Sequence, residues 1–90
     1  EPTRVRIDAG GHAAGRPLAE LNLRGRTGAT VLAMRRGDEA WRMPGARERL
    51  EAGDELLLAG VTTAVEAARR VLARGVEEGE AAGERGLAGS

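Results

Sequence analysis

The chain has 90 residues, enough for one domain with a modest core, and its fourteen basic residues balance its fourteen acidic ones. It has no cysteine, which excludes thiolate metal sites and thiol nucleophiles and favours a reducing cytosol. Its one aromatic residue, Trp41, cannot supply a stacking surface for single strands, so nucleic acid is not expected as a partner. No stretch approaches the roughly 18 apolar residues of a membrane span, which predicts a soluble piece of protein.

Two elements are predicted at the beginning of the chain. Residues 4–8 alternate polar and apolar side chains, which is the period of a half-buried strand. Pro17 suits the first turn of a helix, because its missing N–H needs no partner there. Leu18 and Leu21 give that helix an apolar face, and we expect it to end near residues 22–24.

Three strands and a short turn are predicted in the middle of the chain. Residues 29–34 form a continuous apolar run between glycines, typical of a strand covered on both faces. A tight turn leads back into a partner strand over 40–43, which Pro44 ends. Residues 46–50 are expected to form one helical turn, and the apolar run 55–59 is expected to form a further strand.

The last predicted element is a helix with an apolar face. Thr63 and Glu66 have the spacing of a capping box, and Gly75 is a suitable stop. We therefore expect a domain over 1–75 and a flexible tail, rich in Glu, Gly and Ala, over 76–90. The predicted class is α/β (α+β), in the order β-α-β-β-β-α. Apolar surface that so small a core cannot hide favours a dimer.

The side chains that could carry catalysis are few. His12 is the only histidine, and it is either a hydrogen-bond donor at a ligand or a solvated loop residue. Ser90 is the only serine and lies in the predicted tail, which argues against a Ser/His/Asp triad. Asp54 follows Gly53 at a turn, where an aspartate commonly bonds its own backbone. The chain is therefore predicted not to be an enzyme and to hold no metal site.

Charge is a better guide to a ligand. Residues 1–49 carry ten arginines and six acidic residues (+4), whereas residues 50–90 carry four arginines and eight acidic residues (−4). Arg16, Arg24 and Arg26 cluster around the first predicted helix and the loop after it. Guanidinium groups pair bidentately with phosphate, so this cluster either binds an anion or only solubilises the surface.

Three motifs in unbroken order resemble a known family. Residues 15–24 (GRPLAELNLR), 28–37 (GATVLAMRRG) and 50–60 (LEAGDELLLAG), with Pro44 between the last two, resemble the RCK C-terminal domain, also called TrkA-C. The match covers about residues 4–74. The resemblance implies a β-α-β-β-β-α fold, in agreement with the order predicted above.

The resemblance also implies a function. RCK C-terminal domains are regulatory parts of bacterial and archaeal potassium channels, potassium uptake systems and cation/proton antiporters. They form homodimers, and several bind cyclic di-AMP in the cleft between two C-terminal domains. The resemblance implies a cytoplasmic location at the inner face of the cell membrane. The implied partner is a membrane-embedded cation channel or transporter, which lies either in the same chain or in a separate subunit.

The matching positions imply the core of a nucleotide site. Arg24 ends the first helix, where nucleotide-binding members place an arginine beside the phosphate. Leu18 and Ala19 match the apolar residues that flank the adenine, and Pro44 matches the proline after the third strand.

Two positions depart from the family pattern. Thr30 stands where uptake-system members carry Asn, and Thr27 stands where they often carry an aromatic residue. His12 and Arg16 are the nearby side chains that could serve as donors in their place. The alternative is a structural dimerisation module of a transporter subunit with no small-molecule ligand.

Overall fold

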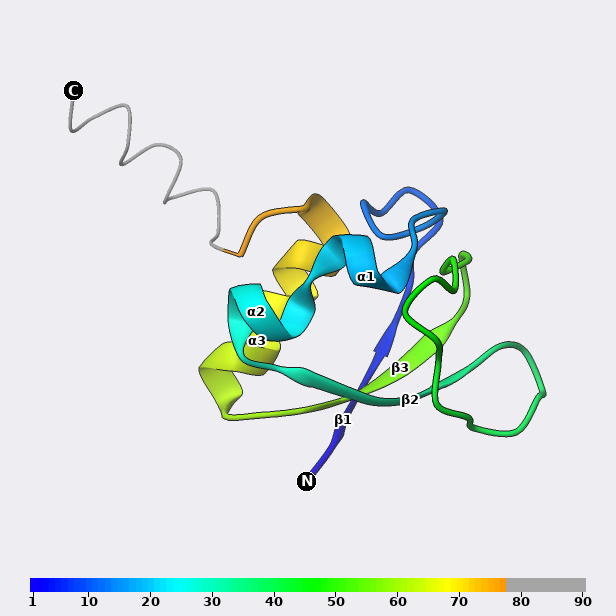
Figure 1. The fold of residues 1–90 in the computed structure, drawn as a ribbon, viewed down its shortest axis with the longest axis horizontal. Helices are drawn as coiled ribbons and strands as arrows, with labels where there is room; N and C mark the ends of the chain where they lie inside the picture. The colour runs from blue at the N-terminus through cyan, green and yellow to red at the C-terminus, as the bar shows by residue number, and fades with distance from the viewer. Residues whose placement is uncertain (78–90) are drawn as a thin grey trace, which may run out of the picture.

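The computed structural model of the chain describes residues 1–77. Most of the predicted tail, 76–90, therefore lies outside the described residues. The elements occur in the order β-α-α-β-β-α and comprise β1 (Thr3–Arg6), α1 (Leu18–Leu21), α2 (Leu23–Thr27), β2 (Thr30–Arg35), β3 (Glu55–Ala59) and α3 (Thr62–Arg74). All three helices lie on one side of the sheet (Figure 1). The α+β class predicted from the sequence is confirmed.

The sheet has the strand order β1-β3-β2, and both pairs are antiparallel. Leu56 of β3 lies opposite Val5 on one side and Met34 on the other, so these three side chains share a face. The register of β2 shifts between Val31 and Ala33, which leaves Leu32 in a bulge and 40% exposed. The long apolar strand β3 is thus the centre of the sheet.

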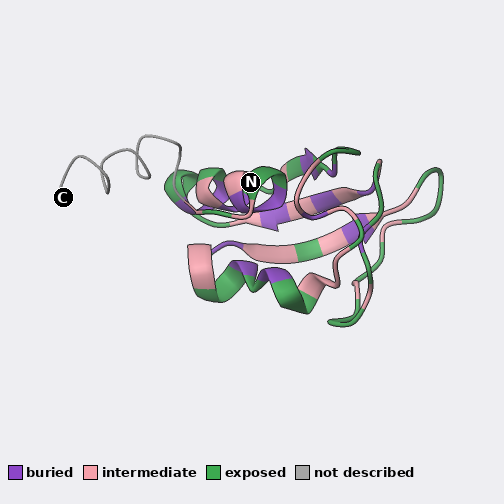
Figure 2. Cartoon of the chain, turned by 90° about the horizontal axis from the view of Figure 1, so that it is seen from above, coloured by how far each residue is buried: buried purple, intermediate pink, exposed green. Residues whose placement is uncertain are grey.

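The hydrophobic core lies between the helices and one face of the sheet (Figure 2). Leu56 and Leu58 are fully buried, while their neighbours in β3 are only half-buried, which is the alternation of a strand covered on one face. Ala68 and Val71 of α3 complete the core from the helical side. The prediction that residues 29–34 are covered on both faces is therefore wrong for the single chain: of the residues of β2, Met34 alone is buried.

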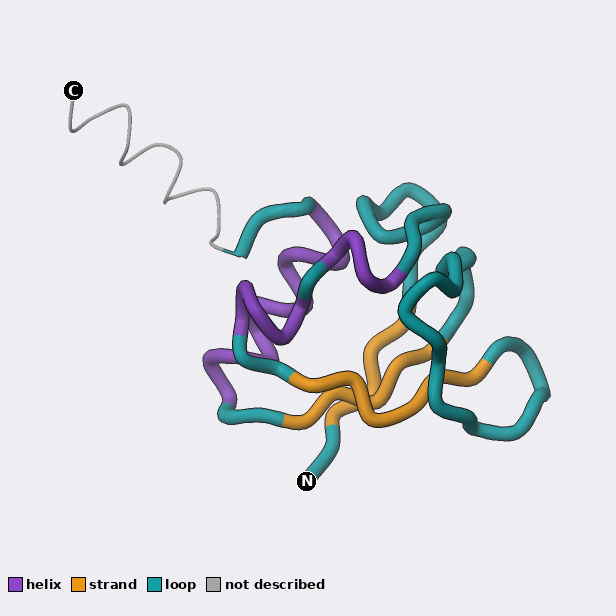
Figure 3. The backbone as a smooth tube through the Cα atoms, viewed as in Figure 1, coloured by secondary structure: helices purple, strands orange, loops and turns teal. Residues whose placement is uncertain are grey.

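The predicted third strand over 40–43 is reduced to a bridge. Met34 and Arg42 exchange two backbone hydrogen bonds, of 2.7 and 2.9 Å, but no ladder continues from them. Pro44 has no N–H with which to extend the pairing. Residues 36–54 instead form the long connection between β2 and β3 at the right of Figure 3.

Three local predictions are corrected. Asn22 adopts the left-handed conformation (φ 45°), which asparagine tolerates better than most residues, and it separates the predicted first helix, α1, from a second short helix. That second helix, α2, continues to Thr27 through residues that were expected to form a loop. Thr63 is not the cap of α3, which begins at Thr62 after the extended residue Val61 and has no side-chain cap bond. The expected helical turn over 46–50 is a two-residue turn followed by a bridge to Pro17.

Candidate functional site

An open groove of about 340 Å³ lies beside α1, α2 and the beginning of β2. Four residues that the sequence predicts for the site line it: Leu18, Ala19, Arg24 and Thr30. Most of the other lining side chains are apolar, so the groove combines an apolar surface with one guanidinium group. That combination suits a flat, partly apolar ligand that carries a negative charge.

Local structure explains how α1 and α2 present these residues. The left-handed turn at Asn22 separates two short helices, and Leu21 and Leu23 on either side of it are both buried. Burial of the two leucines leaves Ala19 and Arg24 exposed on the groove side. The second helix ends at Gly28 (φ 86°), whose N–H donates to the carbonyl of Arg24 at 2.9 Å. Leu21 and Leu23 thus hold α1 and α2 against the core, and Leu23 also lines the groove.

Arg24 differs from the two arginines with which it clusters in sequence. Arg16 donates to the carbonyl of His12 at 2.7 Å and pairs with Glu20 at 3.0 Å. The guanidinium of Arg26 donates to the carboxylate of Glu77 at 2.7 Å, which raises the pKa of Arg26 above its ordinary value. Within residues 1–77 Arg24 makes no ion pair and no side-chain hydrogen bond, so its charge faces the groove uncompensated.

The far wall of the groove belongs to the loop 36–54. Ala46 lines the groove, and its carbonyl accepts the N–H of Ala19 at 2.8 Å. The carbonyl of Glu48 accepts the N–H of Leu18 at 2.9 Å, so the loop satisfies N–H groups at the start of α1 that have no partner within the helix. Arg42 donates to the carboxylate of Glu48 at 2.6 Å and holds the pKa of Glu48 below its usual value.

A network of charged side chains holds the loop 36–54 in place. Asp54 is 1% exposed and accepts two hydrogen bonds from Arg36, both of 2.9 Å, and one from the N–H of Glu51 at 2.8 Å. Burial alone would raise the pKa of Asp54, but these hydrogen bonds outweigh it and hold the pKa below its ordinary value. Arg36 also donates to the carbonyl of Arg49 at 3.0 Å. The predicted backbone bond of Asp54 is confirmed, and Arg36 is the partner that the sequence did not reveal.

Three other predicted site residues do not line the groove. The side chain of His12 lies against the end of α3, where a Cβ added to Gly75 would come within 2.8 Å of its Nδ1 atom. Arg16 points to Glu20, as described above. Pro44 is two residues before Ala46, outside the lining. These three assignments stay predictions, because no ligand contact tests them.

Several lining residues were not predicted from the sequence: Asn22, Leu23, Ala29, Val31 and Ala46. Leu23, Ala29 and Val31 directly adjoin predicted residues, and Asn22 lies within the first motif, so a wider reading of the first two motifs would have found these four. Ala46 had no such signal, because the backbone bond to Ala19 brings it there.

The described part of the chain offers neither a metal site nor a membrane span. Within residues 1–77 no three His, Cys, Asp or Glu side chains are grouped so that they could hold a metal ion. Over the same residues, every helix is too short or too polar to cross a membrane.

A small antiparallel sheet with helices on one face and a groove beside α1 defines a small α+β domain. Residues 3–73 match the TrkA-C domain, so the chain belongs to the TrkA-C family. No curated protein is significantly similar to the chain.

Solved structures of similar proteins support the same family assignment. The potassium transport protein KtrA RCK C domain, in complex with cyclic di-AMP, is 27% identical with a TM-score of 0.66; the match covers 78% of this chain and 82% of that one. The RCK C domain dimer of S. agalactiae BusR, also with cyclic di-AMP, is 25% identical with a TM-score of 0.64, covering 79% and 86%. The fold is therefore that of regulatory domains related to cyclic di-AMP-binding proteins.

A further structure of S. agalactiae BusR is a complex with its busAB-promotor DNA, and the match covers 34% of that longer chain at 25% identity and a TM-score of 0.64. The RCK C-terminal fold thus occurs in proteins of more than one kind.

Proposed function

We propose that this domain is a cytoplasmic sensor that binds a cyclic dinucleotide, cyclic di-AMP, in the groove beside α1, and thereby biases the gating of an attached potassium or other cation transport protein. The observation that carries the proposal is that Arg24, without a partner in residues 1–77, shares one groove with Leu18, Ala19 and Thr30. Two similar domains form complexes with cyclic di-AMP, which supports the choice of ligand.

In this proposal each lining residue has a chemical role. Leu18 and Ala19 contact the flat face of an adenine, and the guanidinium of Arg24 pairs with a phosphate oxygen. The hydroxyl of Thr30 is a donor or acceptor for the base edge. Thr27 is not available for that purpose, because its hydroxyl donates to the carbonyl of Leu23 at 2.6 Å and accepts the N–H of Ala29 at 3.1 Å.

The groove is open on one side, which fits a site completed by a second copy of the domain. A homodimer would place two grooves side by side, and a dinucleotide with two adenines would then meet two equivalent walls. Such a ligand biases the parent protein only if it binds one arrangement of the pair better than the other. In this proposal His12, Arg16 and Pro44 contact the ligand from outside the groove or from the second copy of the domain.

A calorimetric titration tests the proposal. We expect one cyclic di-AMP per two chains, and we expect Arg24→Ala to lower the affinity by about tenfold to a hundredfold, the range for a lost hydrogen bond to a charged group. The matched control is Arg47→Ala, since Arg47 is exposed and does not line the groove. Both variants should remain dimers.

The alternative is a structural dimerisation module without a ligand. Titrations with cyclic di-AMP, other nucleotides and divalent cations separate the two functions. An absence of heat with every compound, from a chain that is folded and dimeric, would favour the structural module.

A further inference from the structure

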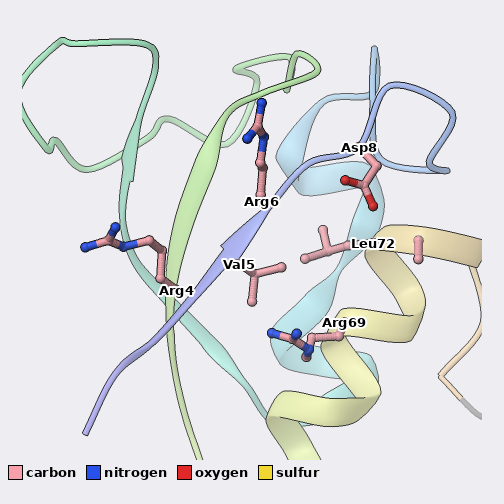
Figure 4. Close-up of a pocket in the computed structure, with 7 residues that line it drawn as sticks. Arg4, Val5, Arg6, Asp8, Arg69 and Leu72 are labelled. Carbon is pink, nitrogen blue, oxygen red and sulfur yellow. The ribbon is translucent and has the colours of Figure 1, made fainter.

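The last turn of α3 is packed against the sheet. Val71 and Leu72 are both buried. Figure 4 shows Leu72 extending from α3 toward Val5 of β1, beside a cavity of about 320 Å³ between these two elements. Gly75 ends the helix in the left-handed conformation (φ 82°), and its N–H donates to the carbonyl of Val71 at 2.8 Å. The sheet thus holds the end of α3 in place.

The segment that leads into α1 is bound to this end of α3. The N–H of His12 donates to the carbonyl of Ala73 at 3.1 Å, and the N–H of Ala13 donates to the carbonyl of Leu72 at 2.9 Å. Carbonyls in the last turn of a helix have no partner within it, so these bonds satisfy two of them. The helices of the groove are therefore attached to the end of α3 at their N-terminal side.

Arg26 makes a second attachment, from α2. Its Nη2 atom donates to the carbonyl of Gly75 at 2.8 Å, and its Nε atom donates to the carboxylate of Glu77 at 2.7 Å. The hydrogen bond to Glu77 raises the pKa of Arg26 and lowers the pKa of Glu77. We call these three groups, the guanidinium of Arg26 with the carbonyl of Gly75 and the carboxylate of Glu77, the Arg26 clamp.

The helix α2 carries both Arg24 and Arg26. Two positions along a helix correspond to a rotation of about 200°, so Arg24 faces the groove while Arg26 faces the end of α3. Arg26 itself does not line the groove. A helix of five residues is unstable on its own, so the position of α2 depends on the burial of Leu23 and on the Arg26 clamp.

We propose that Arg26 is a positioning residue for the nucleotide groove and that its clamp couples occupancy of the groove to residues 75–77. The inference rests on the proposed binding of cyclic di-AMP. A closed clamp holds α2 so that Arg24 is already oriented toward the ligand, which lowers the entropy lost on binding. By linkage, a ligand that fixes α2 stabilises the closed clamp by the same factor. Residues 75–77 then respond to the ligand although they lie outside the groove.

Calorimetric titration with cyclic di-AMP tests the first half of the inference. Arg26→Gln removes the ion pair and should lower the affinity about threefold to tenfold, whereas Arg26→Lys keeps the charge and should lower it less. Glu77→Gln leaves the bond to Gly75 and should lower the affinity about twofold. The controls Arg47→Gln and Glu66→Gln remove the same charges at exposed positions outside the groove and the clamp, and they should change nothing.

Amide hydrogen exchange of the full chain, followed by NMR, tests the second half. Saturating cyclic di-AMP should slow exchange of the Gly75 N–H in the wild type by the factor that Arg26→Gln costs in affinity, about threefold to tenfold. In Arg26→Gln the ligand should leave this exchange rate unchanged. A purely structural role of Arg26 predicts no such response of Gly75 to the ligand.

The failure of this inference can be told apart from the failure of the proposed function. Wild-type affinity in folded Arg26→Gln and Glu77→Gln would overturn the inference and leave the nucleotide site intact. So would a Gly75 exchange rate that the bound ligand does not change. An absence of heat from folded wild type would instead refute the proposed function, and the inference would be refuted with it.

Discussion

Arg36, in the loop 36–54, and Arg24, in the groove, carry the same kind of side chain but differ in its partners. Arg36 donates to the buried carboxylate of Asp54 and to the carbonyl of Arg49, so its donors are engaged in holding the chain. Arg24 projects from a short helix into an open groove and makes no such bond within residues 1–77. We therefore propose Arg24 rather than Arg36 as the anion contact, because the donors of Arg36 are already engaged by Asp54 and Arg49.

The two regions are also connected. The loop held by Arg36 supplies Ala46 to the wall of the groove and backbone carbonyls to the start of α1. Loss of the Arg36 network should therefore disturb both stability and binding, whereas loss of Arg24 should disturb binding alone.

The largest effect is expected for Arg36→Ala. The substitution leaves the carboxylate of Asp54, which is 1% exposed, without its charged partner. Because the side chain of Arg36 is itself 28% exposed, we expect a loss of about 2–3 kcal/mol in the free energy of unfolding, below the usual range for a fully buried pair. Chemical denaturation measures it. Arg47→Ala is the matched control, and an equal stability of the two variants would contradict the role given to Arg36.

A smaller effect is expected for filling the groove with Ala46→Leu. Ala46 is exposed and contributes only its carbonyl to the contact with Ala19, so the fold should tolerate the larger side chain. The added atoms occupy space that the ligand needs, and the affinity for cyclic di-AMP should fall by about tenfold, or ~1.4 kcal/mol. Calorimetry compares it with Ala40→Leu, which places the same side chain at an exposed position outside the groove. Equal affinities would mean that the ligand binds elsewhere.

The smallest effect is a change in the acid dependence of stability. Asp54 has a pKa below its ordinary value in the folded chain, so the folded state favours the ionised carboxylate. Its contribution is complete above the ordinary pKa of about 4 and is lost as the pH falls through the lowered folded value. Stability should therefore fall on acidification below about pH 4.

Asp54→Asn should reduce that slope only in part, because the pKa values of Glu48 and Glu55 are also lowered by their arginine partners. Unfolding followed at several acidic pH values measures the slope. Asp38→Asn, at an exposed turn, is the control. If Asp54→Asn kept the full wild-type slope, Arg36 and Asp54 would not be coupled as described.

The sequence predicted the sheet better than its connections. The runs 29–34 and 55–59 are apolar and bounded by turn residues, and they correspond within one residue to β2 and β3. The strand expected over 40–43 was wrong, because only Met34 and Arg42 pair and Pro44 has no N–H with which to extend that pairing. Long-range ion pairs such as Arg36 with Asp54 leave no periodic pattern in a sequence.

In the candidate site, too, the residues close together in sequence could be predicted, whereas those brought together by long-range contacts could not. Leu18, Ala19 and Arg24 lie along one short helical segment, so their proximity follows from the helical period. Thr30 joins them because β2 begins directly after that segment. Ala46 could not have been found in this way, since a backbone hydrogen bond across 27 positions places it. The side chain of His12 lies against Gly75 at the end of α3, a contact that cannot be predicted from the sequence.

The most direct test of the account is an amide chemical-shift map of the full chain during titration with cyclic di-AMP. We expect the largest changes on the groove residues, from Leu18 to Arg24 with Thr30 and Ala46, and we expect them to saturate at one ligand per two chains. Absence of changes, or changes concentrated along β1 and α3, would contradict it.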